Sequence, residues 1–569
     1  MSSFEELKNG KIEVMRTNIF IKTKRLVKVL PFYLFTLLPL FTSCSESYLD
    51  VESKTESNTS NFYKTQNDAY RALIGCYDGW RQTSSNPGFA FYVASEAMGV
   101  ECFGATGNTD GRGYQVVDRF DIAQSSSDLN LYEADWERYY QGIYRCNELI
   151  KYEPQIEWKN ETLKGTYMGE CHALRAILYF DLVRMFGNIP LLTVATEENV
   201  PQADPAEVYQ VIFDDLQFAI DNIPADAYPK SDAANNDGHI TKYAAEALYA
   251  RAYLYYTGYY GASIDGVTKD KALAYCEDVI SSGEYDLVAE YKNLWPAASA
   301  GIAEVGDAVT LLGTYAGDGN CETVLAMKFT NTQDYNGNND SNRWQVMLGM
   351  RNLPVAPYGR GWGALTVNPQ FVNQYEAGDT RKKASIIDIV NEGIVNADGF
   401  EASYKDQREY TGYVIKKYSP LCFADGTSAV KIDGSGGFQE QNHQDWVIMR
   451  YADVLLMAAE LGSSSAQKYM DKVRARAGLQ PVAVSQASIM KERKFEFAFE
   501  AINYWDLLRQ GVDYAAQQIA TNGIDVMSGG NADKVVIAAE NIKAKKGLCQ
   551  IPQNQIILSN GVLKQNAGW

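Results

Sequence analysis

Few side chains in this sequence have the types and spacing that catalysis requires. Only three histidines occur, at positions 172, 239 and 443, and they are too isolated for a zinc site or a Ser-His-Asp triad. The chain contains no G-x-S-x-G, H-E-x-x-H or phosphate-loop motif. A glycosidase acid and nucleophile are defined by their separation in space, so the 71 acidic residues leave a hydrolase open.

Binding chemistry is better represented than catalysis. A neutral sugar offers C–H faces and hydroxyl rims, which suit a flat aromatic ring beside hydrogen-bonding side chains. Two loops have this mixture, and any one of their aromatics has the alternative role of filling the interior. The loop residues we predict as ligand-binding are Phe103, Asp110 and Tyr114 in the first, and Arg343, Trp344, Tyr358, Arg360 and Trp362 in the second.

A third loop, "DYNGNNDSN", alternates oxygen ligands in the manner of a calcium loop. The residues are Asp334, Asn336, Asn338 and Asp340. Position 12 of an EF-hand loop would be Gln345, which cannot supply the bidentate carboxylate of that motif. Calcium therefore competes here with a simple solvated turn, and we predict no metal or other cofactor as a requirement.

A single cysteine ends the apolar run near the amino end of the chain. Val29 to Phe41 is uncharged but shorter than the roughly 20 residues that span a bilayer. Basic residues precede the run and small residues follow it, which is typical of a secretory signal. Phe-Thr-Ser-Cys resembles a bacterial lipobox, so we expect Cys44 to carry a lipid anchor; the alternative is ordinary secretion with an incidental cysteine. Residues 1–14 contain three glutamates, and Met15 begins a better signal.

Composition excludes one class of partner. The formal net charge is −19, and such a surface repels polyanions, so we expect no nucleic acid partner. The eight cysteines after Cys44 are widely scattered without a C-x-x-C pair. We interpret them mostly as small buried hydrophobic residues.

The elements that must position these loops are mainly helices. Helical periodicity covers 136–150, 169–187, 204–224, 241–258 and 268–287. Asp204 and Pro205 are typical of a helix start, and Gly187 of a helix end. A small-residue helix followed by an amphipathic one resembles tetratricopeptide pairing. From about 291 to 444 the periodicity fades into Gly-, Asn- and aromatic-rich chain, and helix returns towards the carboxyl end.

Several segments together resemble the SusD/RagB family of Bacteroidetes. The matching segments are "GECHALRA…FGNIPLL", "DDLQFAIDNIP", "AGDTR", "RYADVLLMAAE", "VRARAGL", "ERKFEFAFE" and "IPQNQI…LKQNAGW". The resemblance implies a SusD-like, mainly α fold: a scaffold of tetratricopeptide-like helix pairs and a loop-rich, irregular carboxyl-terminal half. We accordingly divide the chain into a signal (1–43), a lipidated flexible leader (44–60), a helical region (61–290) and a carboxyl-terminal region (291–569).

The resemblance also implies a function without catalysis. Members of this family are outer-membrane lipoproteins that capture oligosaccharide, or peptide in some cases, for a TonB-dependent, SusC-like transporter. Charged residues recur on the otherwise apolar carboxyl-terminal helices, and we interpret them as buried ion pairs that fix one helix against another. A peptide-capturing member and an outer-membrane-anchored hydrolase remain the alternatives to a glycan-capturing protein.

Overall fold

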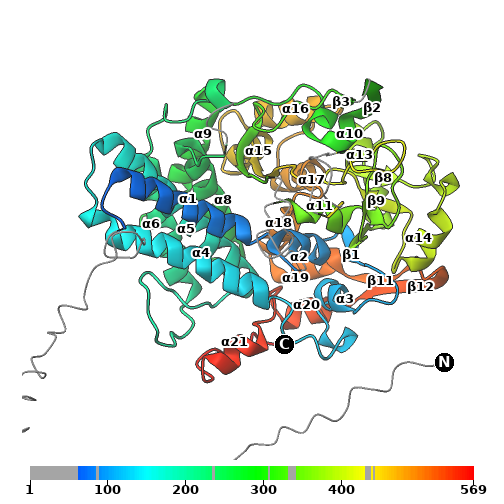
Figure 1. Ribbon diagram of the computed structural model, residues 1–569, viewed down its shortest axis with the longest axis horizontal. Helices are drawn as coiled ribbons and strands as arrows, with labels where there is room; N and C mark the ends of the chain where they lie inside the picture. The colour runs from blue at the N-terminus through cyan, green and yellow to red at the C-terminus, as the bar shows by residue number, and fades with distance from the viewer. Residues whose placement is uncertain are drawn as a thin grey trace, which may run out of the picture. The chain divides into compact units, whose positions relative to one another are not determined.

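Helices dominate the fold, as the sequence predicted (Figure 1). The computed structural model describes residues 62–84, 89–233, 238–305, 308–330, 341–429, 438–439 and 442–569. The first half contributes six long helices: α1 (Gln66–Gln82), α4 (Glu133–Tyr152), α5 (Glu161–Phe186), α6 (Pro205–Asn222), α8 (Lys242–Tyr260) and α9 (Lys269–Ser281). Sequential helices in this group pack on one another, which confirms the predicted pairing.

Local chemistry explains where these helices begin and end. Asp204 forms a capping box with Glu207 and places Pro205 at the first position of α6. Gly187 ends α5 with a φ of 69°, a conformation that disfavours other residues. Along α8, Ala245, Ala247 and other small residues are fully buried, so this helix lies inside the scaffold as its composition predicted.

The second half is built from shorter elements. Its helices are α10 (Pro296–Ser299), α11 (Arg343–Leu348), α12 (Pro369–Val372), α13 (Thr380–Ser385), α14 (Phe400–Asp406), α15 (Tyr451–Glu460), α16 (Ala466–Arg476), α17 (Gln486–Glu496), α18 (Asn503–Leu508), α19 (Val512–Ile519), α20 (Ala539–Ala544) and α21 (Gln553–Leu558). No helix in the described part of the chain is long and apolar enough to cross a membrane.

Strands occur in two-stranded pairs only, within the ranges described. The antiparallel pairs are β1 (Cys102–Gly104) with β7 (Leu365–Val367), β2 (Ala300–Val305) with β3 (Ala308–Gly313), β4 (Thr323–Met327) with β10 (Trp446–Arg450), β8 (Ile386–Asp388) with β9 (Tyr413–Ile415), and β11 (Thr521–Ser528) with β12 (Asn531–Ile537). A parallel pair joins β5 (Met350–Arg351) to β6 (Arg360–Gly361).

The carboxyl-terminal helices are joined by buried ion pairs, which confirms the structural interpretation of their charges. Arg450 contacts Glu322, Glu496 and Glu500 from a side chain that is only 2% exposed. The other buried pairs are Arg381 with Asp379, Glu492 and Glu496; Lys417 with Glu500; Arg474 with Glu492; Arg476 with Glu322 and Glu496; Arg493 with Asp453 and Asp506; and Arg509 with Glu460 and Asp506. Although burial opposes it, the charges of the surrounding arginines lower the pKa of Glu496 to about 2.

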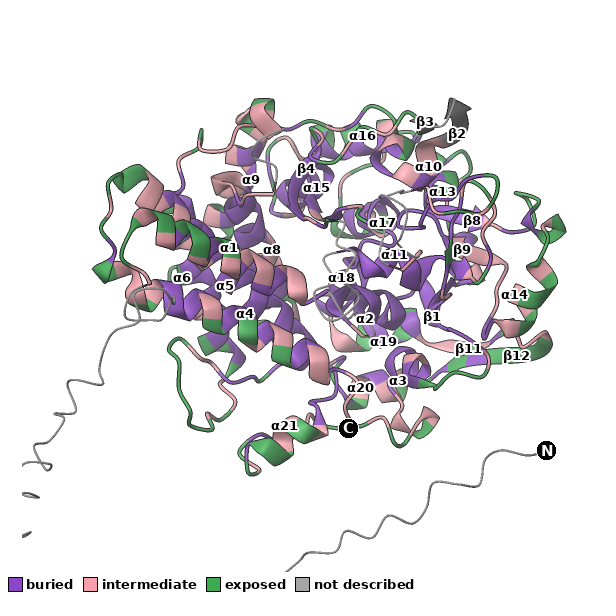
Figure 2. Cartoon of the chain, viewed as in Figure 1, coloured by how far each residue is buried: buried purple, intermediate pink, exposed green. Residues whose placement is uncertain are grey.

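Helix α2 (Phe91–Met98) connects the two halves of the chain at its buried centre (Figure 2). All eight of its residues are buried. Glu96 accepts a hydrogen bond from the Ala501 backbone N–H, and Ser95 accepts one of 2.9 Å from the Trp505 indole. Helix α2 is therefore held in place by α18 and by the residues just before α18. Residues 62–569 form one compact unit.

Candidate ligand-binding face

The two loops that the sequence singled out lie side by side. Strand β1 pairs with β7, with Cys102 opposite Val367. Beyond the strands, the Ala105 N–H donates to the Ala364 carbonyl and the Thr106 N–H donates to the Gly363 carbonyl, each over 2.7 Å. Segments 105–112 and 351–364 therefore form one face together with 406–408. We call these three segments the Arg351 face.

Arg351 ties the segments together. Its Nε donates to Asp406 Oδ2 over 2.7 Å, and its Nη1 lies 3.5 Å from Asp110 Oδ2 and donates to the Trp362 carbonyl. A Cβ on Gly107 would lie 2.2 Å from Arg351 Nη2, so a larger residue there would displace the guanidinium. The geometry thus fixes two carboxylates and one tryptophan backbone around a single guanidinium.

Asp110 is held in its charged form. Its Oδ2 accepts hydrogen bonds of 2.9 Å from the Thr106 hydroxyl and the Gly107 N–H. Burial opposes ionisation, but these hydrogen bonds and the charges of Arg351 and Arg408 lower the pKa of Asp110. Arg408 also donates to the carbonyls of residues 108, 110 and 111 over 2.8–3.0 Å. An exposed carboxylate is thereby presented from a rigid loop.

Aromatic rings with cationic neighbours complete the face. Trp362 is half-buried, and the Arg343 guanidinium lies 5.4 Å from its ring centroid. Arg360 is exposed, and its guanidinium lies 3.8 Å from the centroid of the Phe438 ring. Ring faces beside guanidinium and carboxylate groups can stack on a sugar and bind its hydroxyls.

Trp344, which we predicted to bind the ligand, is buried instead. This indole is 1% exposed, stacks on Tyr92 with centroids 4.7 Å apart, and packs edge-on against Trp446. The cause is local: Asn342 caps α11 through the Trp344 N–H, and the short helix that follows is buried along its whole length. Trp344 therefore fills the core and cannot stack on a ligand.

Two further aromatics are also buried. Phe103 lies in β1 and is 1% exposed. Tyr358 is 7% exposed, and its hydroxyl donates to Glu392 Oε2 over 2.7 Å. Both rings are covered, and the Tyr358 hydroxyl already has a partner. Neither residue therefore offers a ligand the free surface that we had predicted.

The other predicted residues reach the face to different degrees. Asp110 and Arg360 are exposed, whereas Tyr114 is half-buried against Phe89 with ring centroids 4.8 Å apart. Arg343 is 9% exposed and supports the Trp362 ring from within. The calcium candidates Asp334, Asn336, Asn338 and Asp340, and the proposed anchor Cys44, lie outside the described residues.

Sequence reasoning missed the residues that organise the face. Arg351 and Asn352 lie inside the second predicted loop but were passed over for its aromatics, although the Asn352 amide also donates to Asp406 over 3.0 Å. Asp406 and Phe438 come from chain about 45 to 90 residues further along, and no spacing in the sequence connects them to the loop. An arginine among glycines and aromatics was the one available signal.

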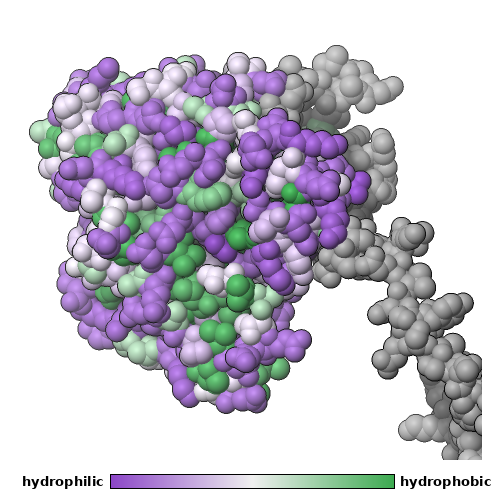
Figure 3. Space-filling view, turned by 90° about the vertical axis from the view of Figure 1, so that its left-hand side faces the viewer, coloured by the Kyte–Doolittle hydropathy of each residue, from purple (hydrophilic) through white to green (hydrophobic). Residues whose placement is uncertain are grey.

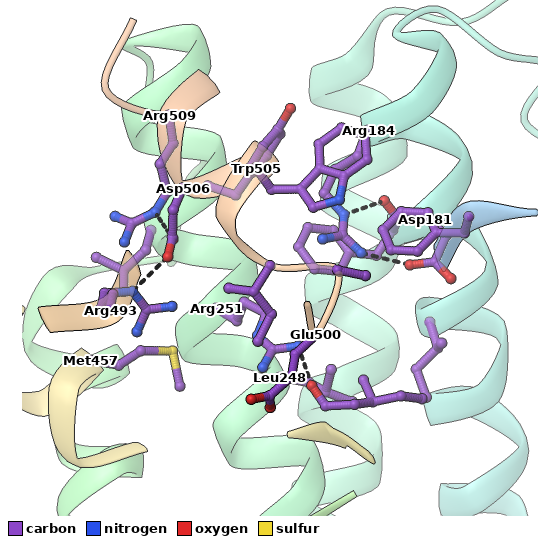
Figure 4. A pocket seen from close by; sticks show the side chains of 18 of the residues that line it. Asp181, Arg184, Leu248, Arg251, Met457, Arg493, Glu500, Trp505, Asp506 and Arg509 are labelled. Atoms are coloured by element: carbon purple, nitrogen blue, oxygen red, sulfur yellow. Dashed lines mark hydrogen bonds and ion pairs between the residues drawn. The ribbon is translucent and has the colours of Figure 1, made fainter. Parts of the chain in front are cut away.

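Hollows also lie outside the Arg351 face. An interior cavity of about 40 Å³ lies among α5, α8 and α18 and is lined by paired charges such as Arg184 with Asp181 and Arg509 with Asp506 (Figure 4). It has room for a few water molecules only. An open groove of about 780 Å³ lies between α4, the loop near Val200 and α21.

The open groove has an apolar border. Tyr144 is 52% exposed and Leu558 is 67% exposed, and both line it. Apolar side chains gather in the lower part of the face shown in Figure 3, the side of the molecule that carries α4 and α21. Such surfaces are typical of contacts between proteins.

Comparisons with known proteins agree with this architecture. The family model described as "SusD family" matches residues 386–569, and the model described as "Starch-binding associating with outer membrane" matches residues 47–254. A SusD-like protein of Bacteroides ovatus is 23% identical, over 86% of this chain and 83% of its own length. SusD-like protein P38 of Formosa agariphila is 24% identical, over 84% of this chain and 90% of its own length.

Solved structures of SusD-like proteins also resemble this chain. A laminarin-binding SusD-like protein superposes with a TM-score of 0.68 and 26% identity, over 89% of this chain and 100% of that one. The surface glycan-binding protein A of Bacteroides thetaiotaomicron, in complex with laminarihexaose, also superposes with a TM-score of 0.68, at 22% identity, over 88% of this chain and 100% of that one. Matches to both family models and over nearly the whole fold identify this chain as a member of the SusD/RagB family.

Proposed function

We propose that the protein captures an oligosaccharide at the cell surface on the Arg351 face. The observation that carries the proposal is the convergence of both sugar-compatible loops on Arg351, which contacts the exposed Asp110 carboxylate from one loop and the Trp362 carbonyl in the other. Similar structures named as laminarin-binding or bound to laminarihexaose support a glycan as the ligand class. Like these relatives, the protein is a binding protein and not an enzyme.

The charge balance of the face favours a neutral ligand over a basic peptide. Acidic loops would suit a basic peptide, and this was the reason to retain the peptide alternative. However, Asp110 and Asp406 both contact Arg351, which offsets part of their charge. A neutral glycan can use such a set of donors and acceptors without bringing charge of its own.

The proposal extends to location and delivery. We propose that Cys44 is acylated and that the lipid holds the protein on the outer membrane, where it passes glycan to a TonB-dependent, SusC-like transporter. The outer-membrane association named in the family description supports this location. The open groove beside α4 and α21, with its apolar border, is a suitable surface for the transporter.

Binding measurements on the purified full chain test the ligand class and the face together. A panel of polysaccharides, with laminarin first, and of basic peptides is titrated by calorimetry. Trp362→Ala should weaken binding of the glycan about tenfold or more, because a stacking contact of about 0.5–1.5 kcal/mol is lost along with buried area. Trp158→Ala, which removes a half-buried indole outside the Arg351 face, is the matched control and should bind as the parent does.

Two results would count against the proposal. If Trp362→Ala and Arg360→Ala both bind the glycan with parental affinity, the site lies elsewhere on the protein. If basic peptides bind and no glycan in the panel does, the peptide alternative replaces the glycan.

A further inference from the structure

Three cysteines from three different helices meet in the core of the helical half. Cys76 lies on α1, Cys146 on α4 and Cys171 on α5, and each is 0% exposed. Their sulfur atoms all lie within 4.8 Å of one another. These helices run beside one another in Figure 1. Residues about 25 to 95 positions apart in the sequence thus place three thiols at one point.

Glycines allow the helices to approach closely enough for this meeting. A Cβ on Gly79 would lie 2.9 Å from the Gly142 Cα, and a Cβ on Gly142 would lie 2.9 Å from Leu178 Cδ1. Gly79 is one turn from Cys76 on α1, and Gly142 is one turn from Cys146 on α4. The backbones of α1 and α4 therefore touch beside the thiols, and the sulfur positions are fixed by rigid elements.

The three sulfurs have nearly the spacing of a metal-thiolate site. None of the eight cysteines in the described ranges is in a disulfide. With a metal–sulfur bond of about 2.3 Å, three sulfurs around one ion are about 4.0 Å apart. Sulfurs within 4.8 Å of one another need to move inward by less than 1 Å to reach that arrangement. Ordinary rotation of the side chains supplies a movement of this size.

We propose that Cys76, Cys146 and Cys171 bind one Cu(I) ion through three thiolate sulfurs. Thiolates are soft ligands that select Cu(I), zinc and iron–sulfur clusters. Structural zinc is almost always four-coordinate, and no fourth His, Cys, Asp or Glu joins this cluster among the residues that the structure describes. Full burial also keeps water from supplying the missing ligand. The site stabilises the scaffold, since it joins three helices through one ion.

Hydrogen bonds and burial shift the pKa values of the three thiols in different directions. Hydrogen bonds from the Cys171 and Cys76 thiols lower the pKa of Cys146, and the positive charge of Arg175 acts in the same direction. The hydrogen bond to Cys146 raises the pKa of Cys76, and burial raises that of Cys171. Metal binding to thiols releases protons. Arg145 offsets part of the charge that develops on Cys76.

The test is a Cu(I) titration of the reduced full chain under anaerobic conditions, against the chromophoric chelator bathocuproine disulfonate. The parent should retain one equivalent of copper, show three sulfur neighbours by X-ray absorption, and melt at a higher temperature with copper than without. Cys146→Ser should retain none. Cys276→Ser is the matched control, because Cys276 is a buried thiol on α9 outside the cluster, and it should retain one equivalent.

The remaining outcomes decide against the site. A reduced parent that retains no copper, or a Cys146→Ser variant that retains as much as the parent, would overturn the proposal. Retention of one equivalent of Zn(II) in competition with Cu(I) would overturn the choice of metal. Cys76→Ala and Cys171→Ala are measured beside the serine variant, so that a folding defect in one variant does not decide the result.

Discussion

At the scale of single residues, Glu246 is a carboxyl group whose pKa the folded structure raises. It lies on α8 with 1% of its surface exposed, and its Oε1 is 3.2 Å from Lys242 Nζ. Burial and the neighbouring Asp278 carboxylate together raise the pKa of Glu246 to about 8. The folded protein therefore holds a proton there that the unfolded chain, with a pKa near 4.5, releases.

A carboxyl group with a raised pKa in the folded state stabilises the protein less as the pH rises from about 4.5 through about 8. Glu246→Gln cannot ionise, so the difference between its melting temperature and that of the parent should increase from pH 5 to about pH 8 and then level off. Differential scanning calorimetry across this range measures the gain. Glu137→Gln makes the same chemical change on the surface of α4. A difference between Glu246→Gln and parent that is constant with pH would refute the assignment.

Trp344 and Trp362 show what the sequence could not predict at this scale. Both lie in the same Gly- and aromatic-rich segment with no periodicity, so composition treats them alike. Their exposure differs because Tyr92 and Trp446, from distant parts of the chain, cover Trp344. The same limit applies to the three clustered cysteines, which appear scattered until the helices that carry them are packed.

At the scale of elements, the buried ion pairs fix α15, α16 and α17 against their neighbours. Asp453 accepts hydrogen bonds from Arg493 and Arg251, and Arg474 donates to Glu492 over 2.6 Å and to the Gln480 carbonyl over 2.7 Å. Removing one member of such a pair leaves its partner charged and buried, which costs about 3–5 kcal/mol.

Asp453→Ala and Arg474→Ala should therefore each lower the free energy of unfolding by about 3–5 kcal/mol. Glycan affinity of the protein that remains folded should stay close to that of the parent. Urea denaturation and calorimetric binding measure the two quantities. Asp525→Ala breaks the exposed pair with Lys534 on β11 and β12 and should change little. Lost binding at an unchanged stability would move Asp453 or Arg474 into the ligand site.

Two glycines of α1 give a second prediction for the elements. A Cβ on Gly79 would meet the Gly142 backbone at 2.9 Å, whereas a Cβ on Gly75 meets nothing within 4 Å. Gly79→Ala should destabilise the protein by about 1–3 kcal/mol through overpacking, and Gly75→Ala should stabilise it by about 0.5–1 kcal/mol through helix propensity. Urea unfolding of both variants tests this. Equal shifts would show that α1 and α4 do not approach closely here.

The elements themselves were the most predictable level of the structure. Asp204, Pro205 and Gly187 mark helix ends through local hydrogen bonding and backbone geometry, and those signals are present in a few neighbouring residues. The short strands of the second half were not predicted. A pair such as β1 with β7 depends on partners more than 250 residues apart, and neither strand has enough residues for a visible alternation.

At the scale of the whole molecule, the proposed lipid anchor at Cys44 gives a prediction about location. Cys44→Ser should abolish labelling with radioactive palmitate and release the protein from membranes into the soluble fraction. The physical reason is that the acyl chains proposed on Cys44 are what would insert into the bilayer. An unlabelled variant that still sediments with membranes would contradict the lipid anchor.

The position of α2 at the centre of the molecule also affects how the chain folds while it is being synthesised. The residue that bonds Glu96 lies 405 positions later in the chain. At a synthesis rate of about 5–20 residues per second, that partner appears roughly 20–80 s after α2 does. During this interval the carboxyl-terminal residues that pack on α2, such as Trp505 on Phe91, have not yet been made. We therefore expect the newly made chain to depend on a chaperone until its last third is complete.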